Sequence, residues 1–167
     1  MPSDSNPALS GSVAVVTGGG RGIGYGIATV LADLGATLVI TGRDENRVAA
    51  AAHELSSHGR ECEGIVCDVT DLDSVTEVGE RLRNRYGRVN VLVNNAGIGG
   101  PSSLLHELDP NSWDEVFNTN VRGVFYMLRA VVPLMIAGSG GHIINISSLA
   151  GKNPLPRGAA YSSSKWP

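Results

Sequence analysis

The chain has 167 residues, of which 42% are hydrophobic and 17% are charged, and its formal net charge is −3. This composition suits one globular domain and excludes a disordered chain or a protein that binds nucleic acid through bulk positive charge. Glycine is enriched, with 22 residues, and the glycines cluster where apolar runs end, as tight turns and close ligand contact require.

Residues 1–12 are polar and contain no apolar stretch of the signal-peptide type. We therefore expect a polar N-terminal tail, a cytoplasmic protein, and no membrane contact, because no apolar run approaches the length of a membrane span. Cys62 and Cys67 have odd spacing on one expected strand, so they should face opposite sides as reduced thiols. The histidines of "HELSSH" (53–58) are five residues apart, and we expect no metal site.

Apolar runs alternate with helical patterns along the chain. Short β-branched runs predict buried strands, and these lie at 13–17, 37–41, 61–69, 89–96 and 142–147. Helices are expected between them, at 22–35, at 44–59 with Asp44 as N-cap and Gly59 as stop signal, at 71–86, and from Asp109-Pro110 onward. This alternation predicts an α/β fold with a doubly wound parallel sheet.

The helix that begins at Asp109-Pro110 is expected to be long. Pro133 should kink or end it, and its expected apolar stripe comprises Trp113, Val116, Phe117, Val121, Val124, Phe125 and Leu128. Asn120 follows Trp113 by seven residues, which places it on the same stripe. A buried amide needs hydrogen-bond partners, and two interpretations remain open: backbone groups of the core, or an ordered water at a kink.

The first expected strand runs directly into "TGGGRGIG" (17–24), in which Gly18, Gly22 and Gly24 follow a G-x-x-x-G-x-G spacing. Glycines at this point let the backbone turn sharply and approach a pyrophosphate, and the next helix N-terminus supplies N–H donors. No lysine stands where a Walker P-loop requires one. We therefore favour a dinucleotide site over an ordinary glycine-rich turn.

The end of the second strand indicates which dinucleotide is preferred. Enzymes that bind NAD place an acid there for the ribose 2′-hydroxyl, but this chain has Gly42, followed by Arg43. Arg21 lies within the glycine turn, and two guanidinium groups suit a 2′-phosphate. We predict NADP(H) rather than NAD(H), with solvated surface arginines as the alternative.

Further motifs follow in order: "CDVT" (67–70), "NNAG" (94–97), "NTNVRG" (118–123), "NISSLAG" (145–151) and "YSSSK" (161–165). Together with the glycine turn, the set resembles the short-chain dehydrogenases/reductases, and among them the 3-oxoacyl-[acyl-carrier-protein] reductases, from Val13 to Lys165. The resemblance implies a Rossmann fold, hydride transfer between NADP(H) and a small-molecule carbonyl or alcohol, and a homo-oligomer.

The resemblance also implies roles for single residues. Asn120, Ser148, Tyr161 and Lys165 would form a catalytic tetrad. In it, Tyr161 would exchange the proton, Lys165 would favour its phenolate, Ser148 would orient the substrate and Asn120 would hold a water. The implied cofactor contacts are Gly18, Arg21, Gly22, Ile23, Gly24, Arg43, Asp68, Val69, Asn94, Ala96, Gly97, Tyr161 and Lys165. Asp68 would contact the adenine, with helix capping as the alternative, and Asn94 would support the turn after the fourth strand.

In this family the chain continues beyond a "YSSSK" motif with further strands and helices. Residues 13–167 are therefore expected to form an incomplete Rossmann-type domain in which "HIINIS" (142–147) is an exposed apolar edge. Two hypotheses remain: an NADP-dependent carbonyl reductase or alcohol dehydrogenase, and a dinucleotide-binding fragment or regulatory module without catalysis. A sugar-nucleotide epimerase fits poorly, because those enzymes usually space the first glycines as G-x-x-G-x-x-G.

Overall fold

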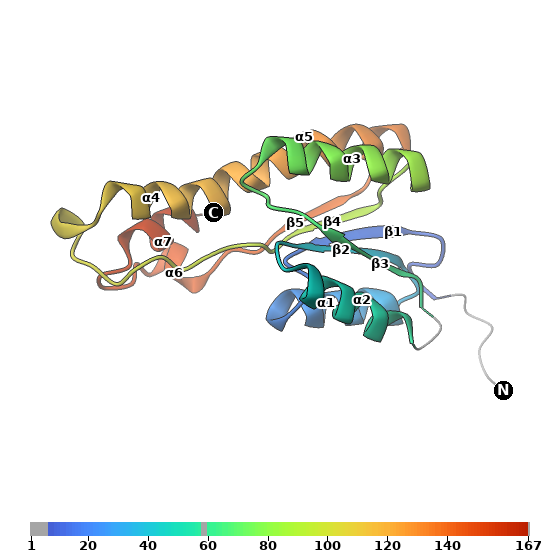
Figure 1. Ribbon diagram of the computed structural model, residues 1–167, viewed down its shortest axis with the longest axis horizontal. Coiled ribbons are helices and arrows are strands. Elements are labelled where there is room, and N and C mark those ends of the chain that lie inside the picture. The colour runs from blue at the N-terminus through green and yellow to red at the C-terminus, as the bar shows by residue number, and fades with distance from the viewer. Residues whose placement is uncertain (1–6, 58–59, 167) are drawn as a thin grey trace.

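A parallel five-stranded sheet forms the centre of the computed structural model, which describes residues 7–57 and 60–166 (Figure 1). Its order is β3-β2-β1-β4-β5. The strands are β1 (Val13–Thr17), β2 (Thr37–Gly42), β3 (Cys62–Val66), β4 (Val91–Asn94) and β5 (His142–Asn145). Because successive strands add first on one side of β1 and then on the other, the strand order switches between β1 and β4. In such sheets a crevice for ligands opens at the carboxyl ends of the strands beside that switch.

Helices cover both faces of the sheet, which confirms the doubly wound fold (Figure 1). Helices α1 (Gly22–Asp33) and α2 (Glu45–Ser56) lie on one face, and α3 (Leu72–Tyr86) and α5 (Gly123–Ala137) lie on the other. The remaining elements gather beyond the carboxyl ends of the strands, and they are the 3₁₀ turn η1 (Leu105–Glu107), α4 (Pro110–Phe117), the π turn η2 (Asn118–Arg122), α6 (Leu149–Lys152) and α7 (Ala159–Ser164).

The two faces of the sheet carry separate apolar cores. Cys62 packs beside the core under α1 and α2, whereas Cys67 belongs to the core under α3 and α5. The two cysteines therefore face opposite sides, as their spacing predicted, and both are free thiols. Burial raises the pKa of both, and that of Cys62 reaches about 12 with a further contribution from the Glu63 charge.

Several predicted helix ends are confirmed by their hydrogen bonds. A side-chain oxygen of Asp44 accepts from the backbone N–H of Arg47 at 3.0 Å, so Asp44 is the N-cap of α2. Asp109 accepts in the same way from the N–H of Ser112 at 3.2 Å. Gly59, the predicted stop of α2, lies outside the described residues. Of the expected N-terminal tail, the described part includes Leu9, which packs beside the core.

The predicted apolar stripe of the long helix is wrong in its second half. Val121 and Phe125 are 44% and 57% exposed, and the buried positions there are Gly123, Met127 and Val131. The cause is η2, because a π turn inserts an extra residue and rotates the following helix relative to the preceding one. Pro133 does not end the helix, which continues to Ala137.

The continuous helix Pro110–Ala137 is long and apolar enough to cross a membrane by length and composition alone, contrary to the expectation from the sequence. A core helix of a soluble protein satisfies the same criterion. In this fold the α5 part packs against α3 and β4, so a membrane does not have to be invoked to explain its apolar residues.

Strand β5 forms one edge of the sheet, and all four of its residues are exposed. Ile143 and Ile144 are 43% and 46% exposed. The strand therefore presents an apolar edge, as expected from "HIINIS".

Candidate active site

The glycine turn leaves no room for a side chain at Gly18 and Gly24. Gly18 has a φ of +65°, and a Cβ atom on it would lie 3.0 Å from the Asn95 amide nitrogen. A Cβ atom on Gly24, which is buried in the first turn of α1, would collide with the Gly18 carbonyl oxygen. The turn thus brings backbone groups and the α1 N-terminus to the opening beside β1.

The side-chain amide of Asn95 holds the glycine turn. Asn95 Nδ2 donates to the carbonyl oxygens of Thr17 at 2.9 Å and Gly18 at 3.3 Å. The Asn94 side chain instead contacts the neighbouring strand β5, where its Nδ2 donates to Asn145 Oδ1 at 2.9 Å. Asn95 lines the cavity and Asn94 does not, which is consistent with the alternating side-chain directions of successive strand residues.

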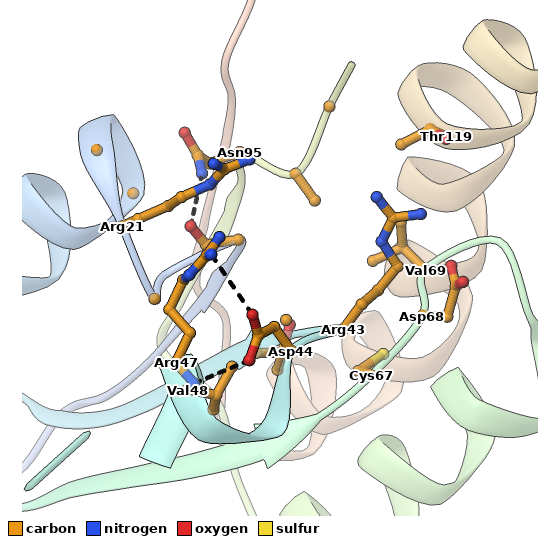
Figure 2. Close-up of a pocket in the computed structure, with 18 of the residues that line it drawn as sticks. Arg21, Arg43, Asp44, Arg47, Val48, Cys67, Asp68, Val69, Asn95 and Thr119 are labelled. Carbon is orange, nitrogen blue, oxygen red and sulfur yellow. Dashed lines mark hydrogen bonds and ion pairs between the residues drawn. The ribbon is translucent and has the colours of Figure 1, made fainter. Parts of the chain in front are cut away.

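A cavity of about 570 Å³ lies beside the glycine turn at the carboxyl ends of β1, β2 and β4 (Figure 2). Ten of the predicted cofactor contacts line it, namely Gly18, Arg21, Gly22, Ile23, Gly24, Arg43, Asp68, Val69, Ala96 and Gly97. Sequence reasoning missed other lining residues, among them Thr41, Arg47, Cys67, Asn95, Ile98 and Thr119. Several of these follow or end a strand, which is the signal that could have found them.

Arginines surround one end of the cavity. In Figure 2, Arg21 and Arg47 lie on one side of the opening and Arg43 lies on the other. Arg47 pairs with Asp44 at 3.5 Å, whereas Arg21 and Arg43 form no ion pair with any residue that the structure describes. The cavity therefore offers guanidinium groups to an anion, as the NADP prediction requires.

Asp68 lines the cavity and also organises the chain after β3. Its Oδ1 accepts from the N–H of Thr70 at 2.9 Å and from the Thr70 hydroxyl at 2.8 Å. Asp71, and not Asp68, caps α3 by accepting from the N–H of Asp73. The capping alternative for Asp68 is therefore wrong, and its contact with adenine stays a prediction.

Thr41 gives a further indication that a polar ligand fits this cavity. The residue lines the cavity, and its buried hydroxyl has no hydrogen-bond partner among the described residues. A buried hydroxyl without a partner is costly. Together with the tight glycine turn and the arginines, it matches the requirements of a phosphorylated dinucleotide.

Asn120 joins three segments of the chain next to the cavity. Its Oδ1 accepts from the N–H of Ile98 at 2.8 Å, and its Nδ2 donates to the Ile98 carbonyl at 2.9 Å and to Ser164 Oγ at 2.9 Å. Of the two interpretations that the sequence left open, the backbone one is observed, with Ser164 as an additional partner. The side chain is buried, with the residue 6% exposed, and the implied water relay stays a prediction.

Lys165 lies at the end of α7, close to Gly97 in the loop after β4. Its Nζ donates to the Ile146 carbonyl at 2.8 Å, and burial lowers the pKa of its ammonium group. A Cβ atom on Gly97 would lie 3.3 Å from this Nζ and 3.0 Å from Asn120 Oδ1. Gly97 also lines the cavity, so it is the point at which the cavity adjoins Asn120 and Lys165.

Ser148 and Tyr161 lie on the two short helices beyond the sheet. Ser148 is the N-cap of α6, where its Oγ accepts from the N–H of Ala150 at 3.1 Å. Tyr161 is half-buried within α7, which packs against α4 and α6. The four predicted catalytic residues do not themselves line the cavity, and their catalytic roles stay predictions.

A glycine turn that opens a helix at the switch point of a parallel sheet defines an α/β protein of the dinucleotide-binding class. Residues 12–167 match the family model of the short chain dehydrogenases, and the chain belongs to this family of oxidoreductases. The family binds nicotinamide dinucleotides.

Individual proteins that are similar to this chain are also short-chain oxidoreductases and dehydrogenases. A 3-oxoacyl-[acyl-carrier-protein] reductase of Thermotoga maritima is 36% identical over 94% of this chain and 63% of its own. A metagenomic short-chain oxidoreductase in complex with NADP is 47% identical with a TM-score of 0.90, over 95% of this chain and 72% of that one. An NAD⁺-bound xylitol dehydrogenase is 32% identical with a TM-score of 0.90, over 94% and 60%. Across the curated relatives considered, the chain spans 55–67% of their length.

Proposed function

We propose that this protein is an NADP(H)-dependent oxidoreductase that interconverts a small-molecule ketone and the corresponding secondary alcohol. The observation that carries the proposal is the position of Gly97, which lines the dinucleotide cavity and also adjoins Asn120 and Lys165. A nicotinamide that reached this end of the cavity would therefore meet the residues to which the family motif assigns proton transfer.

The preference for NADP(H) is supported by the cavity wall. Gly42 stands where an acid would bind the ribose 2′-hydroxyl, and Arg21 and Arg43 line the same cavity without an ion pair among the described residues. Guanidinium groups match the geometry and charge of a 2′-phosphate. The NADP complex of the 47% identical relative agrees with this assignment, whereas the xylitol dehydrogenase was solved with NAD⁺.

If bound in the cavity, a reduced nicotinamide would provide the hydride needed to reduce a carbonyl carbon. Tyr161 gives the proton to the carbonyl oxygen, and the same groups act in reverse when an alcohol is oxidised. A free phenol titrates near pH ~10, so it needs a neighbouring positive charge to exchange protons near neutrality. Lys165, the C-cap of α7, follows Tyr161 by four residues and supplies that charge, since an ammonium favours the phenolate.

Two further residues have positioning roles in this scheme. Ser148 hydrogen-bonds the substrate oxygen and orients it for the transfer. Asn120 fixes Ile98 and α7 relative to one another through the hydrogen bonds described above, so the cavity end and the proton-transfer residues keep a constant separation. The whole protein is proposed to act as a homo-oligomer, by analogy with its family.

The direct test is turnover by the full chain. NADPH oxidation would be followed with a panel of ketones that includes 3-oxoacyl thioesters and cyclic ketones, while cofactor binding is measured separately by fluorescence. We expect binding and turnover with at least one ketone, both stronger with NADPH than with NADH. Binding without turnover of any ketone or alcohol would contradict the enzyme and favour a dinucleotide-binding module.

A further inference from the structure

We propose that Arg47 is a third arginine of the 2′-phosphate subsite, and that Asp44 restrains it and thereby sets how strongly the site selects phosphorylated ligands. This inference rests on the proposed NADP(H) function and concerns the same cavity. Asp44 was expected only as a helix cap, and Arg47 was not among the predicted contacts.

The position of Arg47 is the first observation. Arg47 lies in the first turn of α2, which packs against the glycine turn: the Arg47 Cγ lies 3.5 Å, and its carbonyl oxygen 3.6 Å, from the position of a Cβ atom on Gly20. Both residues line the cavity. Figure 2 shows Arg47 below Arg21 and across the opening from Arg43. A phosphate between these side chains would thus meet guanidinium groups from three separate elements.

The two contacts of Asp44 are the second observation. One carboxylate oxygen accepts from the Arg47 backbone N–H at 3.0 Å, and the other lies 3.5 Å from the Arg47 guanidinium. Both side chains are about half exposed, at 48% and 51%. An exposed ion pair of this kind is weak, so a phosphate dianion can compete for Arg47. The Asp44 carboxylate opposes that exchange, because it holds Arg47 and repels the incoming charge.

The cap and the charge of Asp44 can be separated by one substitution. Asparagine caps helices about as well as aspartate, so Asp44→Asn keeps the bond to the Arg47 N–H while it removes the negative charge. Arg47→Ala removes the guanidinium, and Arg47→Gln serves as a second variant that keeps most of the side-chain length. Arg83→Ala is the matched control, because Arg83 is exposed on α3 and does not line the cavity.

Calorimetric titration of the full chain with 2′,5′-ADP and with 5′-AMP measures the phosphate contribution without any turnover. We expect Arg47→Ala and Arg47→Gln to weaken 2′,5′-ADP by about tenfold, which is the usual scale for one charge-assisted hydrogen bond. Asp44→Asn should tighten 2′,5′-ADP by about threefold or more, as expected when one nearby like charge is removed. Binding of 5′-AMP should change little in every variant, and Arg83→Ala should match the parent chain.

A double variant tests whether Asp44 acts through Arg47. If it does, the gain from Asp44→Asn is clearly smaller when position 47 is already alanine. Unchanged 2′,5′-ADP affinity in both Arg47 variants, with unaltered thermal unfolding, would overturn this inference and leave the NADP(H) proposal standing. A parent chain that binds 5′-AMP and 2′,5′-ADP equally well would instead refute the NADP(H) preference itself, and the inference with it.

Discussion

The side-chain amide of Asn120 donates to the hydroxyl of Ser164 at 2.9 Å and so joins the π turn to the helix that carries Tyr161 and Lys165. The Ser164 hydroxyl in turn donates to the Tyr161 carbonyl at 2.8 Å. Asn120 also holds Ile98 by both backbone groups. One amide therefore links the loop after β4, the long helix and α7, which fixes the relative positions of the residues proposed to transfer the proton.

Ser164→Ala should weaken this junction. The Asn120 amide would keep its bonds to Ile98 but lose its partner on α7, so we expect the free energy of unfolding to fall by about 1 kcal/mol, the usual net value of one hydrogen bond. Turnover should fall more than cofactor binding, because Lys165 and Tyr161 lose their positioning. Ser163→Ala is the control, since Ser163 is exposed on the same helix. Equal behaviour of the two variants in urea unfolding and in kcat would contradict the positioning role.

Tyr161→Phe removes the proposed proton donor and keeps the aromatic ring. We expect kcat to fall by at least ~100-fold, the lower range for a general acid, while NADPH binding is nearly unchanged. Stopped-flow measurement of NADPH oxidation gives kcat, and a fluorescence titration gives the affinity for NADPH. Turnover that survives the substitution would show that another group donates the proton.

Arg43→Ala should reduce affinity for NADPH selectively. Arg43 lines the cavity opposite Arg21, and loss of its charged hydrogen bonds should cost about 1.5–3 kcal/mol of binding free energy. Affinity for NADH, which has no 2′-phosphate, should be little affected. A similar loss for both cofactors would mean that Arg43 contacts a part that they share.

The sequence located residues that line the cavity where backbone conformation decides their position. Glycine spacing after β1 fixes the turn, and the end of β2 brings Arg43 to the same opening, so both could be found without coordinates. Which of Asn94 and Asn95 contacts the glycine turn depends on the register of β4, since a shift by one residue reverses the side-chain direction. Register is decided by pairing with β1, which is a tertiary contact.

The π turn and Arg47 escaped prediction for a similar reason. The apolar pattern from Trp113 onward assumes a constant helical period, and η2 breaks that period. Gly123 follows η2 directly, but a single glycine inside a helical pattern does not predict a π turn. Arg47 lies close to Gly20 because the first turn of α2 packs against the glycine turn, and helical periodicity alone does not reveal that contact. Both features depend on how separate elements pack.

Gly24→Ala should disrupt the glycine turn, because its Cβ atom would collide with the Gly18 carbonyl oxygen and with the Asn95 amide. To avoid this collision, the first turn of α1 would have to move away from Gly18, which would widen the glycine turn. NADPH binding should therefore weaken, and the free energy of unfolding should fall.

Gly26→Ala is a matched control on the same helix, where a Cβ atom would meet nothing within 4 Å. That substitution should stabilise the chain by about 0.5–1 kcal/mol, because alanine favours a helix interior over glycine. Parallel thermal unfolding and cofactor titration of the two variants would reveal the contrast, and equal effects would show that the turn tolerates a side chain.

The Cys62 thiol should make the fold sensitive to alkaline pH. Burial, together with the Glu63 charge, raises its pKa from an ordinary value of 9.0 to about 12. The folded chain therefore holds this proton more tightly than the unfolded chain, so the contribution to stability is complete below pH 9 and is lost as pH rises toward 12. Cys67 and Tyr86 act in the same direction, since burial raises the pKa of each, whereas the lowered pKa of Lys165 acts in the opposite one.

Urea unfolding at neutral pH and above pH 9 measures this effect. The free energy of unfolding should fall less at alkaline pH for Cys62→Ala than for the parent chain. The rate of thiol alkylation gives an independent measurement, because the thiolate is the reactive form. Cys62 of the native chain should react far more slowly than the same cysteine in urea. Rapid alkylation of native Cys62 near pH 8, or identical alkaline losses in the two chains, would contradict the raised pKa.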